Sequence, residues 1–458
     1  MHADVTGKII MASAAERLAA NFDLSVLAKA TELKRRLLFV LGALIVARIG
    51  AHIPIPGIDP AILSDIFKEH SGGILGVFNM FSGGALGRMT IFALAVMPYI
   101  SSSIIVQLLT VASPQLAALK KEGEAGRRKI NQYTRYGTVA LAMLQGYGIA
   151  VGLEGMHSSA GSSAVMDPGL FFRITATATL VGGTMFLMWL GEQITARGIG
   201  NGISLIIFGG IVAEFPRALG ATFELGRRGV LSTEFLLVLV IFGLALLALI
   251  VFMERAHRRI IVQYPKRMVG NRLYAGDTSH IPLKLNVSGV IPPIFASSLL
   301  LFPLTIAGFN AGKQPGWLTN ITSYLQHGEP VYMLLYVAII VFFSFFYTSV
   351  VFNVDETAEN LKKHGGFVAG VRPGKQTAQY LDYVLTRLTV LGAAYLAFVC
   401  VVPEFLVARY AIPFALGGTS LLIVVNVMMD FVAQVQSHLF AHQYEGLIRK
   451  ANLKGKRS

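Results

Sequence analysis

Few residues in this 458-residue sequence have the types and the spacing that catalysis or metal binding requires. The segment GVRPGKQT, residues 370–377, contains the Gly-Lys pair of a phosphate-binding loop, but that loop needs a glycine where Ala369 stands and a serine or threonine where Gln376 stands. The sequence has no HExxH zinc motif and no GxSxG nucleophile motif. Its one cysteine, Cys400, excludes an internal disulfide and a zinc site built on cysteines. We therefore expect no enzyme activity, no metal and no cofactor.

The composition indicates a membrane protein. Hydrophobic residues make up 54% of the chain and charged residues only 14%, whereas a soluble globular protein has about 25% charged residues. Apolar windows of about 20 residues, the length that crosses a bilayer as a helix, mark ten candidate spans. They lie near 36–53, 89–111, 136–153, 171–191, 200–215, 234–253, 287–308, 331–352, 383–404 and 410–432. The sequence predicts an all-α polytopic membrane protein with ten transmembrane helices.

Positive charge alternates between the segments that connect these spans. Most of the 39 lysines and arginines lie before the first span, after the tenth, and in the connections between spans two and three, six and seven, and eight and nine. Because cytoplasmic loops carry an excess of Lys and Arg, this alternation predicts that both termini are cytoplasmic. A missed or an added span would scramble the alternation, which favours the count of ten.

The ten spans divide into two halves of five, and an odd number per half means that the second half runs inverted relative to the first. Short matches favour such a duplication. The segment AVMPYISSS (95–103) of span two corresponds to GVIPPIFASS (289–298) of span seven, and GNGISLIIFGG (200–210) of span five to LGGTSLLIVV (416–425) of span ten. Inverted repeats place their functional site at the interface, so these four spans are candidates for lining a central site.

This division predicts the organisation of the whole chain. The expected parts are a cytoplasmic segment 1–35, an N-terminal half 36–215, a C-terminal half 216–432 with cytoplasmic loops 254–285 and 353–382, and a cytoplasmic tail 433–458. Topology alone leaves a small-solute secondary transporter open as an alternative. The absence of an acidic residue in the middle of any span weakens that alternative, because ion-coupled transporters usually keep such groups for function.

The stretch GILGVFNMFSGGALGR, residues 73–88, is too apolar for a water-exposed loop and too rich in glycine for a spanning helix. As a helix it would be about 24 Å long, short of a hydrocarbon core of about 30 Å. A complete apolar span follows it at once. We expect this stretch to enter the membrane region without crossing it.

Long motifs then occur in order along the chain: IPIPGID (53–59), FNMFSGGAL (78–86), KKEGEAGRRKINQYTRYGT (120–138), FLMWLGEQIT (186–195), RGIGNGIS (197–204), GVIPPIFASS (289–298), ETAENLKKHGGFV (356–368) and GGTSLLIVV (417–425). They closely resemble the motifs of the bacterial SecY family, the central subunits of the Sec protein translocon, and the likeness runs from about Glu32 to the C-terminal NLKGK. The resemblance implies a protein-conducting channel that exports unfolded secretory proteins and releases transmembrane segments sideways into the bilayer.

In that family two inverted halves form a clamshell around an hourglass pore. The resemblance assigns the constricting aliphatic ring to Val96, Ile100, Ile203, Ile207, Ile294 and Ile423. It assigns an external plug to 72–85, with Gly76, Phe78, Asn79, Met80, Phe81, Ser82, Gly83 and Gly84. Without the resemblance, the aliphatic residues would be interpreted as facing lipid or packing between helices, and the glycine-rich stretch as a re-entrant packing element.

The family's lateral gate lies between spans two, three, seven and eight. The resemblance implies that Ser101 and Phe302 face one another across this gate, with Asn286 near its cytoplasmic end. A signal sequence has an apolar core of about 7–15 residues, and it would partition between these helices toward lipid.

The basic cytoplasmic loops would receive either the ribosome, including its rRNA, or the motor SecA. The residues implied are Arg258, Arg259, Lys266, Arg267, Arg272, Arg372 and Lys375, although charge that only sets topology is the alternative for each. The further partners implied are SecE and SecG, signal sequences, nascent polypeptide and the lipid of the bacterial cytoplasmic (inner) membrane. The chain departs from the family at Asn271, where an arginine is frequent, and at Ala369, where a proline is frequent. Both departures leave open the balance of ribosome and motor contacts.

Overall fold

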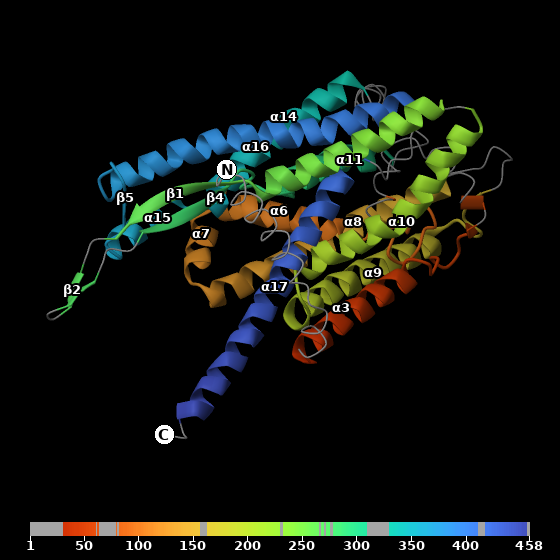
Figure 1. The fold of residues 1–458 in the computed structure, drawn as a ribbon. Coiled ribbons are helices and arrows are strands. Elements are labelled where there is room, and N and C mark those ends of the chain that lie inside the picture. Colours follow the sequence, from red (N-terminus) through yellow and green to blue (C-terminus); the bar gives the residue numbers. More distant parts are fainter. Residues whose placement is uncertain are drawn as a thin grey trace.

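The computed structural model describes residues 31–60, 62–63, 79, 82–155, 163–229, 232–264, 267–269, 272–274, 278–308, 329–410 and 417–455. Long helices run alongside one another, and a small sheet lies at one end of the bundle (Figure 1). The helices are α3 (Thr31–Gly50), α6 (Met97–Ala112), α7 (Pro114–Lys121), α8 (Glu124–Glu154), α9 (Leu170–Arg197), α10 (Gly202–Arg227), α11 (Thr233–Arg255), α12 (Ile291–Gly308), α14 (Pro330–Val351), α15 (Val354–Lys363), α16 (Lys375–Tyr410) and α17 (Gly418–Gly455). The strands are β1 (His257–Gln263), β2 (Arg267–Val269), β3 (Arg272–Tyr274), β4 (Thr278–Lys284) and β5 (Phe367–Val368).

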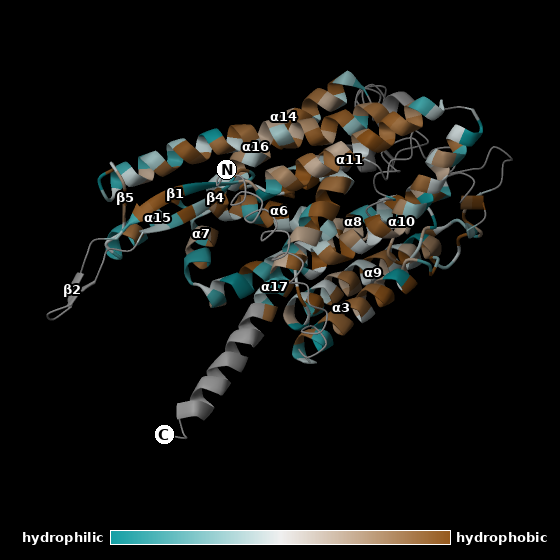
Figure 2. Cartoon of the chain, in the orientation of Figure 1, coloured by the Kyte–Doolittle hydropathy of each residue, from teal (hydrophilic) through white to brown (hydrophobic). Residues whose placement is uncertain are grey.

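The helices carry apolar surface of the kind that faces lipid. Within the described ranges, seven helices are long and apolar enough to cross a membrane, or eight if the bent pair α6 and α7 is one broken span. Figure 2 shows hydrophobic residues along the long helices and hydrophilic residues gathered near α15 and β4. On α11 the large apolar side chains of Leu237, Ile241 and Leu244 are exposed. The chain is therefore a multi-pass membrane protein.

Each of the ten expected spans overlaps a helix, but several bounds differ. The helix of span two begins only at Met97, with Pro98 in its first turn, and α6 and α7 meet at an angle of 100° around Ser113 and Pro114. Proline lacks the amide hydrogen that a helix interior needs, which explains its place at both helix starts. Helix α10 continues to Arg227 past Pro216, and α17 extends well beyond the expected end of span ten.

The segment before α6, residues 82–96, is buried without being helical. Its backbone groups find partners in the irregular chain that follows α3: the Ile55 amide donates to the Met89 carbonyl at 2.9 Å, and the Ile91 amide donates to the Ile53 carbonyl at 3.0 Å. Irregular backbone is tolerated at membrane depth only where protein shelters it and its polar groups are paired. The prediction of a continuous helix over 89–111 was wrong for its first eight residues, because burial and apolar composition do not distinguish a helix from sheltered irregular chain.

The sheet joins the two large polar loops into one unit. Strand β1 pairs with β4 on one side, with Ile260 opposite Ile281, and with β5 on the other side, with Val262 opposite Val368. Beneath it, Ile260, Leu283 and Val368 pack with leucines of α16. The loops expected at 254–285 and 353–382 therefore form a single platform, which the sequence interpretation treated as two separate loops.

Glycine allows two helix starts to approach the preceding helix closely. A Cβ atom on Gly202, at the start of α10, would lie 2.0 Å from the carbonyl oxygen of Gly191 in α9. A Cβ atom on Gly418, at the start of α17, would lie 1.8 Å from the carbonyl oxygen of Val399 in α16. Both glycines belong to the matched sequence segments of spans five and ten, and they make the same contact in each half.

This contact predicts that Gly418→Ala destabilises the protein. The added methyl group meets backbone that cannot rotate away, so α17 must shift from α16, at a cost of about 1–3 kcal/mol. Gly243→Ala is the matched control, because Gly243 lies within α11 and a Cβ atom added there would have nothing within 4 Å. Thermal denaturation of the purified protein in detergent should give a lower Tm for Gly418→Ala only. An unchanged Tm would contradict the close approach.

Candidate functional site

The six residues expected to form a ring lie in one apolar cluster. Val96, Ile207 and Ile423 are buried members of it, and Ile100, Ile203 and Ile294 pack against it partly buried. They come from four elements and the segment before α6: Val96 precedes α6, Ile100 lies in α6, Ile203 and Ile207 in α10, Ile294 in α12 and Ile423 in α17. Both halves of the chain thus contribute to a single cluster.

The cluster residues occupy equivalent places in the two halves. Ile100 follows Pro98 by two residues as Ile294 follows Pro292, and Ile207 follows Ser204 by three as Ile423 follows Ser420. The side chain of Asn201 accepts hydrogen bonds from the amides of Ile203 and Ser204 and so caps the first turn of α10. The cap and the glycine contacts fix where the isoleucines of α10 begin.

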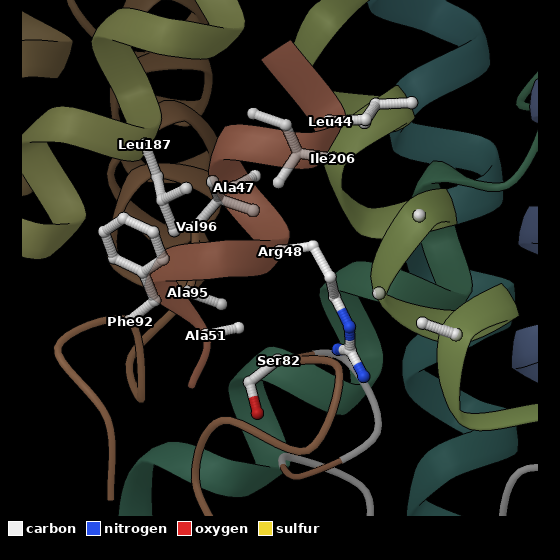
Figure 3. Close-up of a pocket in the computed structure, with 13 residues that line it drawn as sticks. Leu44, Ala47, Arg48, Ala51, Ser82, Phe92, Ala95, Val96, Leu187 and Ile206 are labelled. Atoms are coloured by element: carbon white, nitrogen blue, oxygen red, sulfur yellow. The ribbon is translucent and has the colours of Figure 1, made fainter. Parts of the chain in front are cut away.

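Cavities lie on two sides of this cluster. One of about 300 Å³ lies toward the sheet, where Lys284 at the end of β4 lines it together with Leu205, Val290 and Val427. A second, of about 140 Å³, is lined by Val96, Ile206 and the far end of α3 around Arg48 (Figure 3). Along α10, residues through Leu205 line the first cavity and residues from Ile206 onward line the second. The apolar cluster therefore separates two spaces.

Part of the expected plug forms a compact turn beside the second cavity. The amide of Gly84 donates to the Asn79 carbonyl at 2.6 Å, and the Asn79 side chain accepts from the Gly87 amide at 2.6 Å. The Ser82 hydroxyl donates to the Asn79 carbonyl and accepts from the Leu86 amide. Gly83 and Gly84 have φ of +64° and +79°, the left-handed conformation that favours glycine. Gly76, Phe78, Met80 and Phe81 lie outside the described residues.

In the region of the expected lateral gate, α6, α12 and α14 meet in an apolar seam. Ile104, Phe295 and Phe343 are buried together there, and the Phe295 and Phe343 rings meet edge to face with centroids 5.4 Å apart. Sequence reasoning missed these three residues, since a buried apolar side chain in an apolar span gives no distinct signal. Of the expected gate residues, Ser101 lies in α6 and is half-buried, while Phe302 lies further along α12.

Asn286 is buried in a polar network at the start of α12. Its side-chain nitrogen donates to Glu254 of α11 at 2.7 Å and to the Gly289 carbonyl at 3.1 Å. Its side-chain oxygen accepts from the Ser288 hydroxyl at 3.0 Å and from the Gly289 amide at 3.1 Å. Asn286 therefore ties the beginning of α12 to α11 of its own half, beside the larger cavity.

The expected docking residues lie on or next to the platform. Arg258 and Arg259 are exposed on β1, Arg372 is exposed on the turn between β5 and α16, and Lys375 is exposed at the first turn of α16. The hydroxyl of Thr377 donates to the Arg372 carbonyl at 2.9 Å and holds this turn. Arg267 and Arg272 belong to the hairpin of β2 and β3, and Lys266 lies outside the described residues.

Comparison with known proteins agrees with this architecture. The family model SecY matches residues 90–432. The protein translocase subunit SecY of Escherichia coli strain K12 is 59% identical over 425 residues, which cover 93% of this chain and 96% of that protein. A solved structure concerned with the plug domain of SecY superposes with a TM-score of 0.64 at 19% identity, over 88% of this chain and 92% of that one. Sec61 in the canine ribosome-channel complex gives a TM-score of 0.59 at 17% identity, over 88% and 92%.

The network around Asn286 predicts a loss of stability on Asn286→Ala. The substitution removes a donor from the buried Glu254 carboxyl group, which should cost about 2 kcal/mol. Glu254→Gln is the matched variant, because its amide oxygen can still accept from Asn286, and we expect a smaller loss. Chemical or thermal denaturation of the purified protein measures both. Equal stability of Asn286→Ala and the unchanged protein would show that the network contributes nothing.

Proposed function

The chain belongs to the SecY family and is a protein-conducting channel subunit, and we propose that Val96, Ile100, Ile203, Ile207, Ile294 and Ile423 form its pore constriction. The single observation that carries this proposal is their meeting in one apolar cluster between two cavities. Aliphatic side chains offer an ion no replacement for its hydration shell, so a narrow ring of them excludes ions by dewetting. They also form no fixed hydrogen bonds with a passing chain, so unfolded polypeptide of any sequence can move through.

We propose further that ten helices span the bacterial inner membrane with both termini in the cytoplasm, as two inverted halves. The alternation of basic residues supports the orientation. The matched glycine contacts of Gly202 and Gly418 support the two halves. In this orientation the platform is cytoplasmic and the turn at Ser82–Gly84 lies on the external side of the constriction.

The turn and the residues before it serve as the plug, and the seam around Phe295 serves as the lateral gate. Dispersion and hydrophobic contacts hold α6 against α12 and α14 in the cluster of Ile104, Phe295 and Phe343. A signal sequence with an apolar core can replace such contacts with its own when the helices part. Transmembrane segments then leave through the same seam into lipid.

The platform receives the partner that drives transport. Ribosomal RNA is a polyanion, and exposed arginines on β1 and at Arg372 would give salt-dependent attachment to it. The fold that the chain shares with Sec61 of a ribosome-channel complex supports a ribosome as one partner. SecA is the proposed motor for export after synthesis, and SecE and SecG are the proposed companion subunits.

Cysteine crosslinking tests the constriction. Single cysteines at Ile207 and Ile423, in a Cys400→Ala background, should crosslink to a cysteine in a stalled secretory chain. Val212 on α10 and Met428 on α17 are matched controls, because they lie on the same helices with 41% and 48% of their surface exposed. We expect no crosslinks from these controls. Crosslinks from Val212 and Met428 but not from Ile207 and Ile423 would overturn the proposed pore.

Charge reversal tests the platform. Arg372→Glu should impair SecA-driven export more strongly than ribosome-coupled insertion, because a compact protein contact is lost while the rRNA contact is spread over many cations. Lys363→Glu is the control, since Lys363 is exposed on α15 of the same platform. Export and insertion assays in membrane vesicles measure the two routes. If Arg372→Glu left both routes at the level of the control, the proposed motor contact would be wrong.

A further inference from the structure

Two arginines converge on the carbonyl oxygen of Gly83 in the plug turn. Arg48, near the end of α3, donates to this oxygen through Nη1, and Arg88 donates to it through Nη2 at 3.2 Å. Figure 3 shows the Arg48 side chain extending from α3 toward the turn that carries Ser82. Hydrogen bonds from a charged donor are stronger than neutral ones. The Arg48 bond therefore ties the turn to α3, whereas the Arg88 bond is made within the segment 82–96 itself.

One carboxylate lies beside both arginines. Oε1 of Glu214, on α10, is 3.5 Å from Nη2 of Arg48 and 3.9 Å from Nη2 of Arg88. The Glu214 side chain is only 13% exposed, so solvent screens these pairs less than a surface pair.

The backbone of the turn is shaped for this contact. A Cβ atom on Gly84 would lie 2.3 Å from Oε1 of Glu214, and one on Gly83 would lie 2.9 Å from the Cα atom of Gly210 on α10. The turn therefore rests directly on α10 at Gly210 and Glu214. Because Asn79 and Ser82 bond the turn internally, whatever holds Gly83 also holds the residues around it.

We infer that Glu214 is a positioning residue that latches the plug turn in its seated place by holding Arg48 and Arg88 on the Gly83 carbonyl. The inference rests on the proposed function of the turn as part of the plug. Two guanidinium groups that share one acceptor repel each other, and the carboxylate between them offsets this repulsion. Without the negative charge of Glu214, the two arginines separate toward water and release the turn.

The test is the idle ion conductance of the reconstituted channel complex. Glu214→Gln keeps the size of the side chain and removes its charge. We expect it to raise the conductance without substrate about fivefold, the change that corresponds to losing one partly buried charge pair. Export of a standard secretory substrate, measured on the same samples, verifies that the variant is folded and active.

Two controls separate the latch from a general effect of charge on α10. Glu224→Gln removes an exposed carboxylate of α10 that pairs with Arg228, the residue just after the helix. Arg217→Gln removes an arginine that is 73% exposed and lies 3.7 Å from the other oxygen of Glu214. Neither should change the idle conductance. Glu214→Asp keeps the charge and should leak less than Glu214→Gln. An equal leak from both variants would show that the charge does not hold the turn.

A double variant tests the repulsion itself. Glu214→Gln combined with Arg88→Gln leaves Arg48 alone on the Gly83 carbonyl, so the conductance should fall back toward the unchanged channel. A role limited to packing predicts a further rise instead, and that result would overturn the latch. Deletion of 73–85 is the reference for an unplugged channel. If the deletion raises the idle conductance and Glu214→Gln does not, the proposed role of Glu214 is wrong while the proposed plug remains supported. If the deletion does not raise the conductance, both the proposed plug and the proposed role of Glu214 are wrong.

Discussion

The structure depends on how closely two helix starts approach the helices that precede them. Gly202 meets the Gly191 carbonyl and Gly418 meets the Val399 carbonyl at distances that no side chain permits. These contacts set the height and rotation at which α10 and α17 begin, and Ile207 and Ile423 follow from that start one turn later. The apolar cluster is therefore positioned by backbone contacts, and its isoleucines need only be aliphatic and of the right size.

Much of this arrangement could be predicted from the sequence. Helices that face lipid require long apolar runs, and cytoplasmic loops carry an excess of basic residues, so both features are visible in the sequence. The matched segments around Pro98 and Pro292, and around Ser204 and Ser420, pointed to the elements that meet in the cluster. The start of α6 could not be predicted, since the apolar residues before Met97 are buried in irregular chain that hydropathy does not distinguish from a helix.

Contacts between segments that are distant along the chain could not be predicted from the sequence either. The pairing of Val262 with Val368 joins loops that are separated by several helices along the chain. The residue pattern of either loop does not indicate which strand it pairs with. Nothing in the spacing of the sequence connects Glu214 with Arg48 and Arg88, and only the fold brings the three together. The sequence does not distinguish Phe295 and Phe343 from other apolar residues of their helices. Their ring contact exists only because α12 and α14 pack side by side in the fold. These features depend on tertiary placement, which spacing along a chain does not encode.

The three-stranded sheet has a mechanical consequence. Strand β1 continues from α11, β4 leads toward α12, and β5 leads into α16, so all three strands are rooted in the same half of the molecule. A force that a bound partner exerts on the sheet would therefore be distributed first over α11, α12 and α16, three helices of the same half.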